Sequence, residues 1–273
     1  MMTHFRTNQR GLSIIELLVA LALAMLLLTG VLQVFLSTRQ TIATTDATAR
    51  IQENGRFALE FIAQSARQAG YQEPYLITAK PGIVAYKNCD VLCSKDGTDR
   101  GDRVTFILQP PLIKDDAASA PTRRDCAGNV VAENVVIANS YFIAPADANN
   151  PQPSLACTTF NVATPGSPSA PVRLVDGIEA MQVLYGVGSN SNPTSVSRYV
   201  SATRVLSQNA WNRVTAVRVA VVANSLSEVG GNETLPSNFT LLDTKYPPTG
   251  TAIENPRIAR QIFTTTIRFH NTN

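Results

Sequence analysis

Few residues of this chain could carry out catalysis. It has two histidines, His4 near the start and His270 three residues before the end, so a histidine-assisted nucleophile would depend on a terminal residue. Neither the P-loop motif nor the dinucleotide-binding glycine motif occurs. The sequence therefore provides no catalytic set, and we expect a protein that is not an enzyme and uses no cofactor.

A segment rich in acids and glycine, residues 96–102, could bind calcium together with Asp90 through carboxylate oxygens. It lacks the spacing and the closing glutamate of an EF-hand, and Arg100 and Arg103 could neutralise the same acids. An ordinary turn is therefore favoured. Residues 100–102 also spell the Arg-Gly-Asp tripeptide of cell-adhesion ligands, but three residues recur by chance too readily to support adhesion.

The four cysteines are Cys89, Cys93, Cys126 and Cys157. All follow the apolar N-terminal segment, so disulfides are expected if this part of the chain lies outside the cytoplasm. Three pairings are possible, and proximity in the sequence favours Cys89–Cys93 and Cys126–Cys157. Zinc is disfavoured because Cys89 and Cys93 have neither a second close pair nor a neighbouring histidine. We expect no metal site.

One carboxylate, that of Glu16, occupies an unusual position. It is the only charge in the 25 residues from Leu12 to Leu36. A carboxylate just inside an apolar helix costs about 3 kcal/mol in lipid, so it rarely occurs there without a partner. A cut after Gly11 would give Leu12 a free α-amino group, which could pair with the Glu16 of a neighbouring chain. The sequence therefore predicts a role for Glu16 in helix–helix assembly.

The element that would position Glu16 is a membrane-spanning helix. At 1.5 Å per residue the apolar run forms a helix roughly 37 Å long, which exceeds a bilayer core of about 30 Å. Before it, residues 1–11 carry Arg6 and Arg10 and no acid, which predicts a cytoplasmic N-terminus and an external C-terminal part. A plain single-pass anchor would not explain Glu16, and a cleaved secretory signal has a shorter apolar region.

The helix is expected to continue well beyond the apolar run, because residues 37–69 contain no proline. Small and apolar residues recur there at spacings of three and four: Ile51, Gly55, Ala58, Ile62, Ala66 and Ala69. This stripe predicts an amphipathic second half that packs on another element. We expect one helix of roughly 85 Å that ends at Gly70. Gly30 and Gly55 should each weaken it by about 1 kcal/mol relative to alanine.

The rest of the chain predicts strands and loops. A short helix is expected at 201–208, and surface loops are expected at 110–125 and at 144–171, the second interrupted near 157–162. Alternating apolar residues predict strands over 103–108, 178–187, 214–223 and 262–269, with shorter ones over 83–86, 130–137 and 141–143. A single antiparallel sheet of five to seven strands beneath the second half of the helix would give an α+β fold.

The N-terminal residues resemble the class III signal of type IV prepilins. In that family a dedicated peptidase cuts after the glycine, here Gly11, and N-methylates the new first residue, here Leu12. Glu16 matches the glutamate at the fifth position after the cut, whereas Leu12 replaces the commoner phenylalanine. Residues 52–71, together with residues 211–214 and 260–271, are similar to the W-type minor pilins. Residues 72–177 carry no motif of that family.

The resemblance implies a pilin-like fold and a role in a filament. It implies a leader at 1–11, a transmembrane half of the helix at 12–36, an amphipathic half at 37–70 and a β-rich domain at 71–273. The implied function is that of a low-abundance minor pilin that helps to initiate type IV pilus assembly in a tip or priming complex. The implied location is the bacterial inner membrane, with the domain in the periplasm, and then the pilus at the cell surface.

The partners implied by the resemblance are other minor pilins, the major pilin, the prepilin peptidase, the inner-membrane assembly platform and a tip adhesin. A J-type pseudopilin of type II secretion would share the leader and helix, but residues 52–71 and 260–271 favour the W-type. Once Arg6 and Arg10 leave with the leader, 21 basic and 20 acidic residues remain. This near-neutral balance disfavours direct binding to nucleic acid, as in DNA uptake. The missing catalytic set disfavours a membrane-anchored enzyme.

Overall fold

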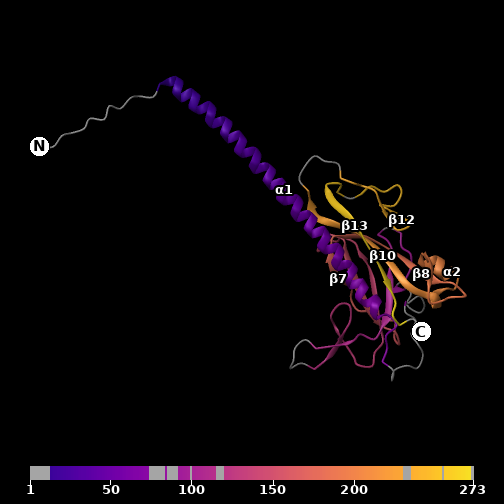
Figure 1. The fold of residues 1–273 in the computed structure, drawn as a ribbon. Coiled ribbons are helices and arrows are strands. Elements are labelled where there is room, and N and C mark those ends of the chain that lie inside the picture. The colour runs from indigo at the N-terminus through magenta and orange to yellow at the C-terminus, as the bar shows by residue number, and fades with distance from the viewer. Residues whose placement is uncertain are drawn as a thin grey trace. The chain divides into compact units, whose positions relative to one another are not determined.

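The computed structural model describes residues 13–73, 84, 92–98, 100–114, 120–229, 235–253 and 255–271. The chain divides into two compact units, residues 1–46 and residues 47–273. Helix α1, Ile14–Gln68, begins in the first unit and ends in the second (Figure 1). The continuous helix predicted from the sequence is therefore confirmed over its described residues.

Local sequence sets both ends of α1. Ser13 precedes the first helical residue, and its hydroxyl accepts a hydrogen bond from the Ile15 N–H at 3.4 Å. At the other end Gly70 has a φ of 77°, in the left-handed region that favours glycine. Its N–H donates to the Ile107 carbonyl at 2.8 Å, which turns the chain toward the first strand.

The second half of α1 buries the face that the spacing predicted. Every member of the stripe is buried: Ile51, Gly55, Ala58, Ile62, Ala66 and Ala69. All of them except Gly55 belong to one core cluster that includes residues of both large sheets described below. The charged residues between the members of the stripe are exposed: Glu53, Arg56, Glu60 and Arg67. This half of α1 is therefore the amphipathic helix expected.

Two four-stranded antiparallel sheets form the framework of the second unit. The first sheet has the order β1-β5-β6-β7, with bounds Val104–Leu108, Ile137–Ala144, Ser154–Asn161 and Val172–Asp176. The second sheet has the order β13-β10-β8-β9, with bounds Ile258–Arg268, Val214–Glu228, Ile178–Gly188 and Val196–Val200. Together with α1 they confirm the α+β class.

The chain passes from the first sheet to the second at Gly177, between β7 and β8. This glycine has a φ of 76°, and a Cβ there would lie 2.7 Å from the Asn224 Oδ1 atom. Both the backbone conformation and the lack of space thus require glycine. The main core lies between α1 and the inward faces of the two sheets, where β8 is buried along its whole length.

Two small sheets and two short helical segments accompany the two large sheets. A three-stranded sheet, β2-β3-β4, comprises Leu112–Ile113, Thr122–Arg124 and Val130–Val131. A two-stranded sheet pairs β11, Phe239–Leu241, with β12, Thr244–Tyr246. The short helix α2, Ala202–Ser207, confirms the helix expected at 201–208, and a 3-10 turn at Trp211–Arg213 follows it.

Several expectations about the middle of the chain are wrong. Residues 130–137 do not form one strand: β4 ends at Val131, a turn follows, and Ile137 opens β5. The predicted loop at 110–125 contains strands β2 and β3. The interruption expected near 157–162 belongs to the almost fully buried strand β6, which begins three residues earlier, at Ser154. The single sheet of five to seven strands is replaced by thirteen strands in the described residues. Of the strand expected at 83–86, only Val84 is described, in a bridge to Phe106.

Candidate functional site

The start of α1 holds the residue that the sequence assigned to assembly. Glu16 folds back on its own helix, and its Oε2 atom accepts the Ser13 backbone N–H at 3.0 Å. With the Ser13 hydroxyl accepting the Ile15 N–H, the two side chains form a capping box of the Ser-x-x-Glu type. Glu16 therefore has a partner within its own chain. The predicted cleavage and methylation residues, Gly11 and Leu12, lie outside the described residues.

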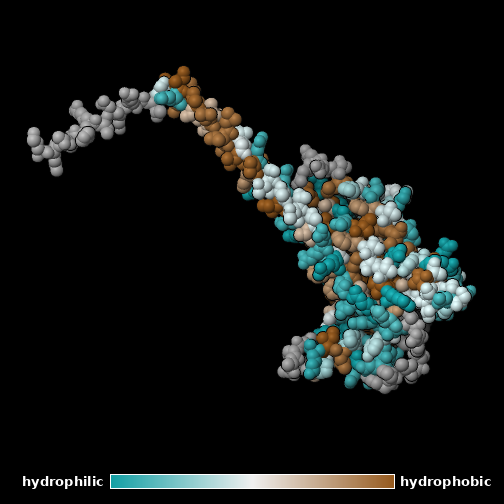
Figure 2. Space-filling view, in the orientation of Figure 1, coloured by the Kyte–Doolittle hydropathy of each residue, from teal (hydrophilic) through white to brown (hydrophobic). Residues whose placement is uncertain are grey.

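The first half of α1 presents an apolar surface. All of its large apolar side chains from Ile14 to Leu36 are exposed, and Figure 2 shows them as a brown stretch along the helix. By length and composition α1 could cross a membrane. In water such a surface would be strongly unfavourable, so it requires lipid or other helices around it.

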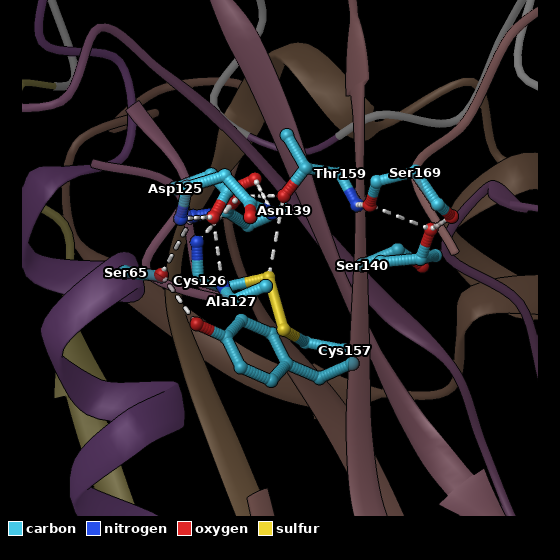
Figure 3. Close-up of a disulfide and its surroundings, with 12 residues drawn as sticks. Ser65, Asp125, Cys126, Ala127, Asn139, Ser140, Cys157, Thr159 and Ser169 are labelled. Carbon is cyan, nitrogen blue, oxygen red and sulfur yellow. Dashed lines mark hydrogen bonds between the residues drawn. A yellow bond between two sulfur atoms is a disulfide. The ribbon is translucent and has the colours of Figure 1, made fainter. Parts of the chain in front are cut away.

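Polar contacts fasten the second half of α1 to the first sheet. The Ser65 hydroxyl lies 2.7 Å from the Tyr141 hydroxyl and accepts the Asn139 Nδ2–H at 3.3 Å (Figure 3). Tyr141 is buried, which raises the pKa of its hydroxyl, although the hydrogen bond with Ser65 opposes that rise. Asn139 also accepts the Thr159 hydroxyl at 2.8 Å. A polar network thus positions β5 and β6 against the helix.

A disulfide lies beside this network. It joins Cys126, in the turn after β3, to Cys157 in the buried strand β6 (Figure 3). This is one of the two pairs favoured from the sequence. Cys93 is also disulfide-bonded, whereas Cys89, its expected partner, lies outside the described residues.

The acidic segment considered for calcium uses its described carboxylates in other ways. Asp96 accepts the Ala202 and Thr203 N–H groups at 2.7 and 2.9 Å, at the start of α2. Asp102 accepts the Gly97 N–H at 3.0 Å and the Val183 N–H at 2.8 Å. Two of the four acids considered therefore fix the 95–103 loop to β8 and α2, and Asp90 and Asp99 lie outside the described residues.

Burial changes the chemistry of Asp102. Its residue is only 3% exposed, and the loss of water raises the pKa of its carboxyl group to about 7. Hydrogen bonds from the Gly97 and Val183 N–H groups oppose that rise, whereas the nearby charges of Asp96 and Asp243 add to it. Because an adhesion ligand must present its aspartate to a receptor, the buried Asp102 contradicts the Arg-Gly-Asp interpretation.

Two buried ion pairs were not foreseen. Arg260 of β13 donates to Glu179 of β8 at 2.7 Å, with both side chains almost fully buried. Arg123 of β3 donates to Glu73, just after α1, at 2.6 Å. The signal available for the first pair was Glu179, a charge within an apolar strand pattern, whereas the second pair had no such signal. The partners lie 81 and 50 residues apart in the sequence.

The described residues suggest no reactive centre. His270 is exposed at the C-terminal end of the second unit. No cluster of three or more potential metal ligands occurs among the residues that the structure describes. The features that remain are structural: an exposed apolar helix with a carboxylate at its start and a disulfide-bonded β-rich unit.

Comparison with known proteins gives matches at both ends of the chain. Residues 140–271 match the family model described as Type IV Pilus-assembly protein W, and residues 6–32 match the Prokaryotic N-terminal methylation motif. No curated protein matches the chain. Among solved structures, a type IV-like pilin from Thermus thermophilus is similar, with 15% sequence identity and a TM-score of 0.43. That alignment covers 82% of this chain and 97% of the other.

Proposed function

We propose that this chain, which belongs to the type IV pilus-assembly protein W family, is a minor pilin that helps to initiate assembly of a type IV pilus. It acts as a low-abundance subunit of a tip or priming complex with other minor pilins. The observation that carries this proposal is the presence in one chain of a methylation motif at residues 6–32 and a W-type domain at residues 140–271. This family is structural rather than catalytic.

Before assembly the apolar first half of α1 anchors the subunit in the inner membrane. The basic leader, residues 1–11, stays in the cytoplasm and the β-rich domain lies in the periplasm. The prepilin peptidase then cuts after Gly11 and methylates the amine of Leu12. The positive charges of Arg6 and Arg10 and the long exposed apolar helix support this arrangement.

During assembly the helices of neighbouring subunits replace lipid around α1. The Glu16 carboxylate pairs with the Leu12 amine of a neighbour, which removes an uncompensated charge from the apolar region. Further along α1, Phe57 and Phe61 are 45% and 37% exposed and lie four residues apart, on one side of the helix. They support continued helix packing outside the membrane.

Deletion of the gene in the native organism tests the role. We expect surface pili to be lost and to return when the chain is supplied from a plasmid, while type II secretion continues. Loss of secretion with normal piliation would instead indicate a J-type pseudopilin. Normal amounts of both would contradict the proposal.

Processing is tested by intact mass and N-terminal sequencing of the protein from native membranes. The expected product starts at N-methylated Leu12. A product that starts at Met1 or Met2, or one cut after the apolar run, would contradict the prepilin pathway.

A further inference from the structure

The outer edge of strand β13 is open in the described part of the protein. β13 pairs with β10 on one side, in nine consecutive antiparallel pairs from Arg260 to Arg268. It is the terminal strand of the second sheet, and no described strand pairs with its other side. Alternate residues of such an edge direct their N–H and C=O groups away from the sheet, where another extended chain can bind them.

This edge has few of the features that prevent pairing. β13 contains neither proline nor lysine, and residues 264–266 are three consecutive threonines, which favour extended backbone. One of its two arginines, Arg260, is committed to the buried pair with Glu179. At the opposite edge of the same sheet, β9 has only five residues. β13 is therefore the edge better suited to pairing.

A groove of about 470 Å³ runs between this edge and α1. Its apolar surface comes from Leu59 and Ala63 of the helix and from Phe263 of the strand. Its described lining comes from α1 and β13, and no residue of β10 lines it. A strand added there would extend the second sheet beneath α1.

The charges of the groove indicate what such a strand carries. On its helical wall Arg67 donates to Glu60 at 2.8 Å, and this contact lowers the pKa of Glu60. Arg56 also lines the groove and makes no ion pair in the described part of the chain. The charge of Arg56 also lowers the pKa of Glu60. Two arginines and one glutamate line the wall, so its net positive charge favours an acidic side chain on the occupant.

We propose that the outer edge of β13 and this groove bind an extended segment of a different pilin subunit. The segment adds a strand to the second sheet, places an apolar side chain against Leu59 and Ala63, and places an acidic side chain near Arg56. The identity of the partner rests on the function proposed above. A second β13 is disfavoured as the occupant because it contains two arginines and no acid.

Photocrosslinking of the full-length chain at native expression level tests the site. Thr264, which is exposed and lines the groove, is replaced by p-benzoylphenylalanine. The control carries the same residue at Arg198, which is exposed on β9 at the other edge of the sheet. We expect a crosslink to a different pilin subunit from position 264 and none from 198. No crosslink from 264, or one only to a second copy of this chain, would overturn the inference.

Charge reversal tests the groove independently. Arg56→Glu should lower the crosslink from position 264 about fivefold, as expected for loss of one exposed ion pair. Arg50→Glu is the matched control, because Arg50 is exposed on the same helix and does not line the groove. Equal effects of the two substitutions would overturn the inference.

The two proposals fail separately. If deletion of the gene abolishes pili but position 264 gives no crosslink, the edge assignment fails and the minor-pilin role stands. If deletion leaves pili intact, the proposed function fails whatever the crosslink shows.

Discussion

The Glu16 carboxylate has one observed contact, within its own helix, and one proposed contact, with a neighbouring subunit. In the chain before cleavage it accepts the backbone N–H of Ser13 and so caps the start of α1. The proposed assembly contact needs the negative charge of the same group. Glutamine retains an oxygen that can accept the Ser13 N–H but has no charge, whereas alanine removes both functions. The two substitutions therefore separate capping from charge pairing.

We expect both Glu16→Gln and Glu16→Ala to insert normally into the membrane and to be lost from pili. The reason is that an uncharged side chain cannot pair with the Leu12 amine of a neighbour. Membrane fractionation and immunoblotting of sheared pili measure the two steps. If Glu16→Gln entered pili normally, the charge would be irrelevant and only the cap would matter.

Asp102 is the residue whose environment predicts a pH effect. Its pKa of about 7 in the folded chain exceeds the value of about 3.9 for an unfolded chain, so the folded state binds the proton more tightly. Its contribution to stability is therefore fully present below about pH 4 and is lost as the pH rises through 7. We expect this loss to be on the order of a few kcal/mol.

Urea unfolding of the full-length chain in detergent micelles measures this effect at several pH values. Trp211 is the only tryptophan and packs on Tyr185 at 5.0 Å, so its fluorescence reports the second unit. Asp102→Asn should flatten the pH dependence between about 4 and 7, since the amide does not titrate. An unchanged pH dependence in this variant would show that other groups cause it.

At the scale of elements, the contact between α1 and β13 depends on a missing side chain. Gly55 was expected to weaken the helix, but the Phe263 ring occupies the place of its Cβ, which would lie 2.3 Å from the Phe263 Cδ2 atom. Helix propensity favours alanine by about 1 kcal/mol, whereas overpacking costs about 1–3 kcal/mol. The cost of overpacking against Phe263 should therefore exceed the gain in helix propensity.

We expect Gly55→Ala to destabilise the second unit by about 1 kcal/mol in the same fluorescence assay. Gly30→Ala is the matched control, because a Cβ at Gly30 meets nothing within 4 Å and Gly30 lies in the first unit. It should leave the unfolding of the second unit unchanged. Phe263→Leu should partly restore the stability of Gly55→Ala, and failure to do so would indicate another source of strain.

At the scale of the whole molecule, the two described units differ in the kind of surface that they expose. The first unit exposes the apolar half of α1, and the second encloses a core beneath the amphipathic half. The disulfide between Cys126 and Cys157 lies in the second unit and closes a loop with a sequence separation of 31. A bond of this kind forms in an oxidising compartment, in accord with the proposed periplasmic location.

Replacement of both Cys126 and Cys157 by serine should lower the free energy of unfolding of the second unit by about 2–4 kcal/mol. The disulfide lowers the conformational entropy of the unfolded chain, and its loss raises that entropy and so favours unfolding. Urea unfolding of the variant and of the parent, with Trp211 as reporter, gives the difference. A change below about 0.5 kcal/mol would mean that the network around Asn139 holds β6 without the bond.

The sequence by itself determined the features that depend on neighbours in the chain. The helix from residue 14 to 68, its buried stripe, its end at Gly70 and the strands β1, β8, β10 and β13 follow from local spacing and residue type. A charge pattern beside an apolar run likewise predicted the leader and the assembly role of Glu16, and both stay predictions. Each of these signals is local because it depends on residues that lie within a few positions of one another in the sequence.

Only the tertiary structure decided features that join distant residues. Strand β6 lies in a segment rich in turn residues, and pairing with β5 and β7 fixes it as a buried strand. Gly55 changes from a weak point to a requirement because Phe263, far along the chain, packs on it. The pKa of Asp102 and the groove beside β13 also arise from segments that meet only on folding, so no local pattern could predict them.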